Sequence, residues 1–373
     1  MLIILLLIGC GTRLDRVANP DTGDYPSLPG LDADILEQMA LDKIPGLAAC
    51  AIKDGALAWC QGYGYADIDA DRVVTPETPF LLASVSKAVA GMALMKAVED
   101  GLLSLDAPIN DTLSFPVSHP SDGTAITARH LAAHASGIKD NWDVAESLYS
   151  VGDPTISLGG FLEGYLVPGG TYYAASGNFV GSGVAQRGVY SNVGAGLMGH
   201  LVESAVDKDF AAYCREELFA PLGLEHTAWY LSGLDVDTLA VPYEVRLGRY
   251  KAVEHYGFPD YPSGQLRSSA EDISRLLMVV MNGGESILSR SSVESMLTVQ
   301  YSDLDSDQGL SFYRWKLGGD TVWGHNGGEV GAATEVLFWQ DEGIGVVVLM
   351  NGEGYGQTLP WIEKRIFAAA ADL

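Results

Sequence analysis

The chain has 373 residues, of which 47% are hydrophobic and 19% are charged, and its 48 acidic and 22 basic residues give a net charge of −26 at pH 7. This composition is typical of one large globular domain or two closely packed ones, and it excludes a disordered or collagen-like chain. The negative charge repels phosphate backbones and anionic membrane surfaces, which excludes nucleic acid as the main partner. We attribute the charge itself to solubility.

The N-terminus begins with an unbroken apolar run at residues 2–8, too short for a bilayer span, which takes about 20 residues. Residues 7–10 (LIGC) resemble the lipobox of bacterial lipoproteins, in which the signal is cut before the cysteine and its thiol is lipidated. We expect 1–30 to be a lipoprotein-type signal and tether, with a lipid on Cys10 as the only membrane contact. The protein would then face the periplasm, anchored in the bacterial cell envelope, or else be secreted or periplasmic. No Lys or Arg precedes the run, so an apolar first strand of a soluble protein is the alternative.

Beyond this segment, hydrophobic periodicity predicts strands and helices at both ends of the chain and a mainly helical middle. The expected helices and strands, in chain order, are a helix at 32–45, strands at 47–53 and 57–61, helices at 85–99, 128–135, 157–165, 195–205, 209–219 and 270–282, strands at 312–317, 320–324, 333–340 and 344–351, and a helix at 358–371. A Gly-rich loop at 166–189 is long enough to be a functional wall. We expect an α/β fold: an antiparallel sheet flanked by helices (31–105 and 226–373), with a helical domain inserted at 106–225.

Two of the four cysteines lie on neighbouring predicted strands. A three-residue hairpin loop at 54–56 would place Cys50 opposite Cys60. We expect two small buried thiols there, and a cross-strand disulfide, which an oxidising compartment permits, is the alternative. Cys214 lies on a helical run and is expected to be buried. The chain has no CxxC pair, so a structural zinc site has no basis and we expect no metal.

Two sequence patterns lack the context that their chemistry requires, and a third pattern is absent from the chain. Residues 194–199 fit GxGxxG, but they follow a Tyr-Ser-Asn loop instead of a buried strand, which favours close helix packing over a dinucleotide site. His130 and His134 are four residues apart, but Leu131 stands where a zinc HExxH motif needs Glu, so we expect structural roles. The absence of a GxSxG elbow argues against an α/β-hydrolase.

The S-x-x-K pattern places a hydroxyl and an amine on one face of a helix, and the chain contains it at 84–87 and at 136–139. Ser84 stands at the first turn of a long predicted helix, where the helix dipole favours a developing alkoxide. Lys87 is placed to accept the proton of this serine. Ser136 stands at the end of a predicted helix, where the dipole opposes an alkoxide. Ser84 is therefore the predicted nucleophile.

Two further motifs follow in order, YSN at 190–192 and HNG at 325–327. Together with S-x-x-K they resemble the serine β-lactamase and penicillin-binding superfamily, and within it the class C β-lactamase-like serine hydrolases, a branch with D,D-peptidases, D-aminopeptidases and esterases. The stretches that also match this family are 126–131, 135–138, 221–224 and 269–272. The resemblance covers about residues 35–370. It implies a β-lactamase/transpeptidase-like fold and a serine hydrolase that uses no cofactor.

The resemblance also implies a role for each matching residue. Ser84 matches the nucleophile that forms an acyl-enzyme, and Lys87 matches its activating partner. Tyr190 matches the tyrosine that passes protons between the serine and the leaving group. Asn192 would hold the substrate amide and steady Lys87. The backbone N–H groups of Ser84 and Gly328 would form the oxyanion hole.

The third motif departs from the K-T-G of lactamases, where a lysine offers a permanent cation to a substrate carboxylate. His325, whose ordinary pKa is near 6.5, is mostly neutral at pH 7, and Asn326 replaces the hydroxyl that would bond the carboxylate. These two residues and Gly327 would line the substrate wall. We therefore expect a small ester, amide or peptide substrate, hydrolysed by a short-chain esterase or a D-peptidase-like enzyme. A β-lactamase, or a penicillin-binding sensor that acylates without turnover, is the alternative.

Overall fold

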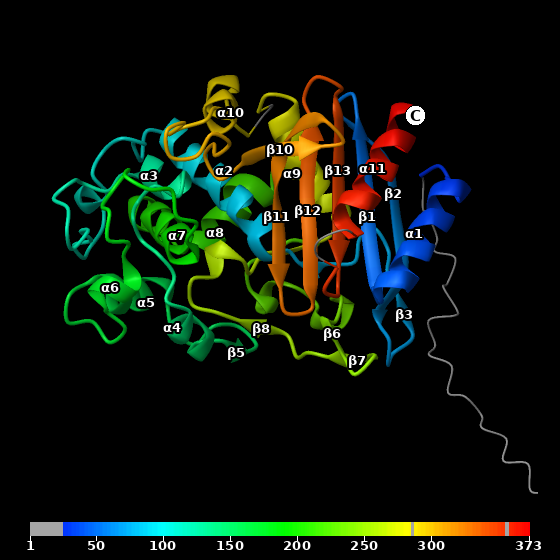
Figure 1. The fold of residues 1–373 in the computed structure, drawn as a ribbon, viewed down its shortest axis with the longest axis horizontal. Coiled ribbons are helices and arrows are strands. Elements are labelled where there is room, and N and C mark those ends of the chain that lie inside the picture. The colour runs from blue at the N-terminus through cyan, green and yellow to red at the C-terminus, as the bar shows by residue number, and fades with distance from the viewer. Residues whose placement is uncertain (1–24, 285–286, 355–357) are drawn as a thin grey trace, which may run out of the picture.

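The computed structural model describes residues 25–373, apart from 285–286 and 355–357. These residues form a seven-stranded sheet beside a mainly helical part (Figure 1). Each pair of neighbouring strands runs antiparallel, in the order β10-β11-β12-β13-β1-β2-β3. Cys10 and the predicted signal lie outside the described residues. Within the described part of the chain, no helix is both long and apolar enough to cross a membrane.

The sheet combines strands from the two ends of the chain. Its strands are β1 (Gly46–Lys53), β2 (Ala56–Asp67), β3 (Arg72–Val73), β10 (Tyr313–Leu317), β11 (Asp320–Glu329), β12 (Ala332–Trp339) and β13 (Ile344–Met350). Three small pairs are β4 (Phe80–Leu81) with β9 (Arg267–Ser268), β5 (Ser150–Val151) with β8 (Tyr256–Gly257), and β6 (Tyr243–Arg246) with β7 (Arg249–Ala252). The α-helices are α1 (Pro29–Asp42), α2 (Ser86–Glu99), α3 (Ala128–Ala132), α4 (Trp142–Ser147), α5 (Leu158–Leu166), α6 (Ala175–Asn178), α7 (Asn192–Val206), α8 (Phe210–Cys214), α9 (Ala270–Met281), α10 (Arg290–Met296) and α11 (Thr358–Ala371).

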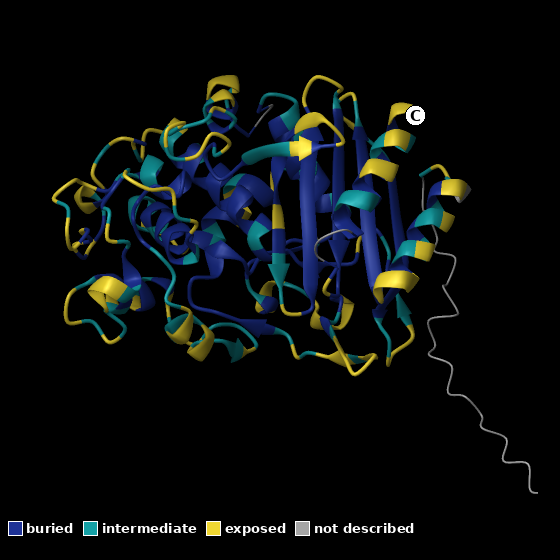
Figure 2. Cartoon of the chain, viewed as in Figure 1, coloured by how far each residue is buried: buried dark blue, intermediate teal, exposed yellow. Residues whose placement is uncertain are grey.

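Helices cover both faces of the sheet. α1 and α11 share one apolar core with the sheet, and α9 shares another core with the opposite face, which continues into α2 and the helical part. β12 and β13 are buried along their whole length, which explains their nearly continuous apolar sequences. Figure 2 shows the same pattern, with buried central strands and exposed outer faces on α1 and α11. The predicted fold, an antiparallel sheet flanked by helices, is confirmed.

Several predicted elements differ from the structure in their bounds: the strand expected at 57–61 extends to Asp67, and the α-helix expected at 209–219 ends at Cys214. Three further differences are as follows. The helix expected at 128–135 ends at Ala132, because His134 has a φ of 53°, which no right-handed helix contains. The loop expected at 166–189 contains the short helix α6. The strand expected at 320–324 continues to Glu329, because the glycines that weaken its strand propensity are paired with β12.

The expectation of two free thiols on β1 and β2 is wrong, because Cys50 and Cys60 form a disulfide. The two residues face each other in the strand register, as predicted. The hairpin loop, however, contains two residues, Asp54 and Gly55, whose φ values of 50° and 80° fit a primed turn. A register shift between Ala51 and Ile52 then brings the cysteines opposite each other.

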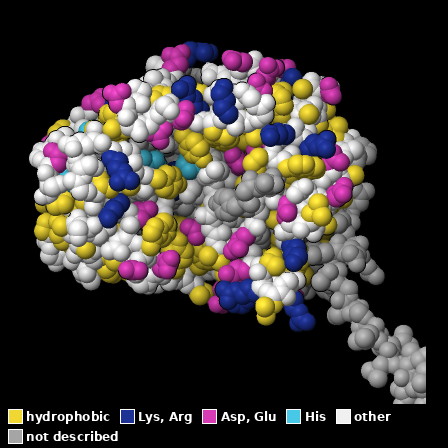
Figure 3. Space-filling view, viewed as in Figure 1, with side chains coloured by type: hydrophobic (Ala, Val, Ile, Leu, Met, Phe, Trp, Pro, Cys, Tyr) yellow, Lys and Arg dark blue, Asp and Glu magenta, His cyan; other side chains and the backbone are white. Residues whose placement is uncertain are grey.

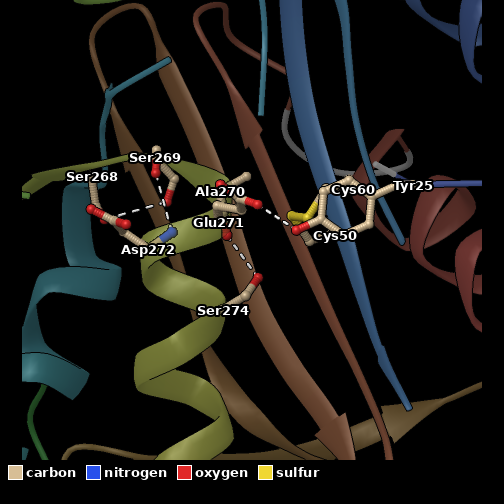
Figure 4. Close-up of a disulfide and its surroundings, with 9 residues drawn as sticks. All are labelled: Tyr25, Cys50, Cys60, Ser268, Ser269, Ala270, Glu271, Asp272 and Ser274. Carbon is tan, nitrogen blue, oxygen red and sulfur yellow. Dashed lines mark hydrogen bonds between the residues drawn. A yellow bond between two sulfur atoms is a disulfide. The ribbon is translucent and has the colours of Figure 1, made fainter. Parts of the chain in front are cut away.

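The disulfide lies beside the start of α9, next to Tyr25 (Figure 4). There the hydroxyl of Tyr25 donates a hydrogen bond to the carboxylate of Glu271, in the first turn of α9. This contact ties the first described residues to α9. Cys214 is a buried free thiol on α8, as predicted, and burial raises its pKa.

A pair of buried carboxyl groups lies between β12 and α11. Glu335 is 5% exposed and Glu363 is fully buried. Burial raises the pKa of both groups, and the neighbouring Glu335 raises that of Glu363 further. Two adjacent carboxylates in an apolar layer repel each other, so the pair retains a proton well above the ordinary pKa of glutamate.

This pair makes the protein less stable as the pH rises. A pKa raised by folding means that the folded chain binds a proton which the unfolded chain releases, so stability is greatest below the unfolded pKa and falls as pH rises toward the folded pKa. Glu363→Gln removes the ionisable group, and we expect it to raise Tm by a few degrees more at about pH 9 than at about pH 5. Thermal unfolding followed by circular dichroism measures this difference.

Glu342→Gln is the matched control, because Glu342 is exposed in the turn between β12 and β13. An equal change in Tm at both pH values for Glu363→Gln would contradict the ionisation of the buried pair.

Candidate active site

Ser84 lies in a 3-10 turn (Ala83–Val85) directly before α2. Ala83 has a φ of 48°, a left-handed conformation that is strained for a residue with a Cβ. β11 runs against this turn, and a Cβ on Gly327 would come within 2.4 Å of the carbonyl oxygen of Leu82 and 2.9 Å of the Ser84 nitrogen. Only glycine permits this approach, so Gly327 sets the distance between the sheet and Ser84.

Lys87 lies one turn further along α2 and is 1% exposed. Its Nζ donates hydrogen bonds to Ser84 Oγ at 3.1 Å and to the carbonyl oxygen of Ser263 at 2.5 Å. It also lies 4.8 Å from the centre of the Tyr190 ring. A buried ammonium requires such partners, because removing it from water costs several kcal/mol. The Ser263 carbonyl is a partner that the sequence motifs did not indicate.

Two carboxyl groups, on the buried Asp260 and the half-buried Glu329, interact electrostatically with Lys87. Burial and the charge of Asp140 together raise the pKa of Asp260 to about 7, although Lys87 lowers it. Burial also raises the pKa of Glu329, whereas a hydrogen bond from the Tyr149 hydroxyl at 3.0 Å and the charge of Lys87 lower it. Lys87 is thus the positive centre of a partly acidic pocket.

Tyr190 lies just before α7 and is 47% exposed. Its ring packs against His134, with 4.5 Å between the ring centres, and the backbone N–H of Ser191 donates to His134 Nδ1 at 3.3 Å. Burial lowers the pKa of His134 to about 3, so this imidazole is neutral at pH 7. His130 has a different role, because it forms a capping box with Thr127 at the start of α3.

Asp140 holds the first turn of α7 in place. Its carboxylate accepts hydrogen bonds from the Ser191 hydroxyl at 3.0 Å and from the backbone N–H groups of Asn192 at 2.9 Å and Val193 at 3.0 Å. A carboxylate is favoured here by the positive end of the helix dipole. Asp140 therefore positions the YSN motif. No sequence motif indicates this contact, because 50 residues separate Asp140 from Tyr190.

His325 lies on β11 and is 2% exposed. Its Nδ1 is 2.6 Å from the carbonyl oxygen of Asn326, and because a carbonyl only accepts, Nδ1 carries the proton. Burial and the charge of Lys87 lower the pKa of His325 to about 3, so the ring is neutral. Its Nε2 is then a hydrogen-bond acceptor. Tyr313 packs edge-on against this ring at 5.1 Å and accepts a hydrogen bond from the Asn326 N–H at 3.3 Å.

These groups border a cavity of about 410 Å³. The residues that line it are Ser84, Tyr190, Asp305, Asp307, Gln308, Tyr313, His325, Asn326 and Gly328. The structure thus brings five of the predicted site residues to one cavity, with Lys87 directly behind Ser84. In the space-filling view, histidine side chains reach the surface near the hollow between the helical part and the sheet (Figure 3).

Three other sequence candidates lie outside this cavity lining. Gly327, expected to line the substrate wall, packs against the Ser84 turn instead. Asn192 is half-buried and, among the described residues, no hydrogen bond joins its side chain to Lys87. Ser136, in the second S-x-x-K, is buried and accepts a hydrogen bond from the Ile138 N–H at 3.3 Å. The GxGxxG segment lies on α7, where a Cβ on Gly196 or Gly199 would meet Asp260 or Pro262 within 3 Å, as helix packing requires. Among the described residues, no group of three or more His, Cys, Asp or Glu side chains is arranged to hold a metal ion.

The fold and the site motifs are of the serine β-lactamase and penicillin-binding type. The Beta-lactamase family model matches residues 31–370, and the chain belongs to this family, which confirms the resemblance drawn from the motifs.

Similar proteins support the same fold. Protein flp of Staphylococcus aureus (strain NCTC 8325 / PS 47) is 24% identical over 255 residues, covering 68% of this chain and 48% of flp, so the chain spans about half the length of this curated relative. The octameric penicillin-binding protein homologue from Pyrococcus abyssi has a TM-score of 0.73 at 25% identity, over 91% of this chain and 77% of that one. The D-amino acid amidase from Ochrobactrum anthropi SV3 has a TM-score of 0.71 at 18% identity, over 92% and 99%.

Asp140→Asn tests whether this carboxylate positions Tyr190. The amide keeps the size of the side chain but loses the charge that complements the helix N-terminus, so the YSN turn should shift. We expect kcat/KM to fall by between about tenfold and a hundredfold, mainly through kcat. Steady-state hydrolysis of an activated ester, with Tm measured in parallel, checks this.

Asp143→Asn, at an exposed acid in the first turn of α4, is the control and should leave kcat unchanged. If Asp140→Asn also retained full kcat, Asp140 would have no part in positioning Tyr190.

Proposed function

We propose that the protein hydrolyses carboxylic esters or amides through an acyl-Ser84 intermediate, as a short-chain esterase or a D-peptidase-like enzyme. The observation that carries this proposal is the 3.1 Å hydrogen bond between Lys87 Nζ and Ser84 Oγ at the wall of an open cavity. A nucleophile within hydrogen-bond reach of its base, and accessible to substrate, is the arrangement that acyl transfer requires.

In the proposed mechanism, Lys87 in its neutral form accepts the Ser84 proton while Oγ attacks the substrate carbonyl carbon. The backbone N–H groups of Ser84 and Gly328 stabilise the resulting oxyanion, a contribution worth about 10²–10³ in rate per donor in other enzymes. Tyr190 then passes a proton to the departing alcohol or amine. Water, deprotonated through the same groups, attacks the acyl-enzyme and releases the acid and free Ser84.

The substrate wall supports esters or amides over β-lactams. Because burial keeps His325 neutral, this position offers no fixed cation to the carboxylate of a β-lactam. Asn326 is exposed at the mouth of the cavity and offers no hydroxyl. A β-lactamase remains the second candidate, because the family model that matches the chain carries that name. A penicillin-binding sensor would share the acylation step but not the hydrolysis.

Paired serine variants test the identity of the nucleophile. Ser84→Ala should abolish hydrolysis of p-nitrophenyl butyrate, because the acyl-enzyme cannot form. Ser136→Ala should retain it, because Ser136 lies outside the cavity lining. Release of p-nitrophenol and the intact mass of the acylated protein measure the two steps. Equal loss of activity in both variants would contradict the assignment.

A parallel assay with a chromogenic cephalosporin separates the candidate activities. We expect wild-type protein to turn over the ester rapidly and the cephalosporin slowly, because the neutral His325 binds the lactam carboxylate weakly. Fast cephalosporin turnover would instead establish a β-lactamase. A stable acyl adduct with no turnover of either substrate would establish the sensor.

A further inference from the structure

We propose that the active-site cavity selects substrates that carry a protonated amine, and that Asp305 binds this cation. The inference rests on the proposed hydrolysis through Ser84 and specifies its substrate class. Some polar groups of the cavity wall already have hydrogen-bond or ion-pair partners within the protein, and the others are left to bind a ligand.

The charged residues that line the cavity are acidic. Asp305 and Asp307 contribute carboxylates, and among the described residues that line the cavity none is Lys or Arg. Lys87 lies behind Ser84, and its Nζ already donates hydrogen bonds to Ser84 Oγ and to the Ser263 carbonyl oxygen. The cavity wall therefore favours a cation over an anion.

The two carboxylates differ in their partners. Asp307 accepts a hydrogen bond and ion pair from Arg314 Nε at 3.1 Å, which compensates its charge. Asp305 accepts only the backbone N–H of Asp307, at 2.8 Å, and no ion pair to it is found among the described residues. Asp305 thus has an uncompensated charge facing the nucleophile's cavity.

His325 provides a second, independent indication of a donor ligand. This residue is 2% exposed and lines the cavity. Its Nδ1–H donates a hydrogen bond to the Asn326 carbonyl oxygen. The remaining Nε2 is an acceptor, with no hydrogen-bond partner among the described residues. A neutral imidazole and a free carboxylate that line the same cavity together match an ammonium group, which only donates hydrogen bonds.

The position of Asp305 indicates where the cation would lie. Asp305 lines both the main cavity and a smaller adjoining one of about 120 Å³, and Tyr190 and Gln308 also border both. The ammonium would therefore lie on the Tyr190 side of Ser84.

Three D-alanine p-nitroanilides that differ only at the amine test the proposal: the free amine is cationic, the N-acetyl form neutral and the N-succinyl form anionic. Their binding to Ser84→Ala, which cannot be acylated, is measured by calorimetry at about pH 6.5, where the amine is protonated. We expect the cationic form to bind about fivefold more tightly than the neutral one and the anionic form to bind most weakly, as an exposed ion pair predicts.

Adding Asp305→Asn should reduce the preference for the cation to less than about twofold while leaving binding of the N-acetyl form unchanged. Asp303→Asn, at an exposed acid of the same loop outside the cavity lining, is the control and should retain the preference. Equal affinity for the three charge forms, binding of none of them, or a preference that survives Asp305→Asn would overturn the proposal.

Turnover of the same series by wild-type protein keeps this test separate from that of the proposed function. Charge selectivity in binding without Ser84-dependent hydrolysis of any ester or amide would overturn the hydrolase proposal and support the cation site. Ser84-dependent hydrolysis without charge selectivity would overturn only the cation site.

Discussion

The burial of one ammonium group, that of Lys87, sets the requirements for the rest of the site. A charge withdrawn from water is tolerated only where hydrogen bonds and opposite charges replace its hydration. Here Ser84 Oγ, the Ser263 carbonyl and the Tyr190 ring surround the Nζ. The buried Asp260 and the half-buried Glu329 also interact with it. The same hydrogen bond that satisfies the lysine holds the serine hydroxyl in the geometry needed for attack.

These partners come from separate parts of the chain, so the site exists only where the sheet and the helical part meet. α2 carries Lys87, β11 approaches the turn of Ser84 through Gly327, and α7 follows Tyr190. Asp140 and His134 fix the start of α7 from the loops of the helical part. A change in the packing between the two parts would therefore move the base, the nucleophile and the tyrosine relative to one another.

The parts of the fold that depend on local hydrophobic periodicity could be predicted from the sequence. The site residues that belong to a motif of fixed spacing could be predicted as well. The closing helix at 358–371 and the sheet core follow from apolar patterns, and Ser84 and Lys87 from S-x-x-K. The sequence did not predict contacts that depend on tertiary structure. A backbone carbonyl such as that of Ser263 has no sequence signature, and Asp140 resembles any loop carboxylate. The extension of β11 through its glycines depended on pairing with β12, which overrides local propensity.

The polar groups left without partners determine what the cavity can bind. Lys87, the cation nearest the nucleophile, is engaged with the protein, so it has little capacity to bind a substrate carboxylate. His325, which replaces the lysine of the lactamase motif, is held neutral by burial and by repulsion from Lys87 itself. The positive charge of the buried Lys87 thus suppresses a second positive charge across the cavity. Asp305 and the neutral His325 are left as acceptors on the cavity lining, and the proposed substrate selection follows from the electrostatics around Lys87.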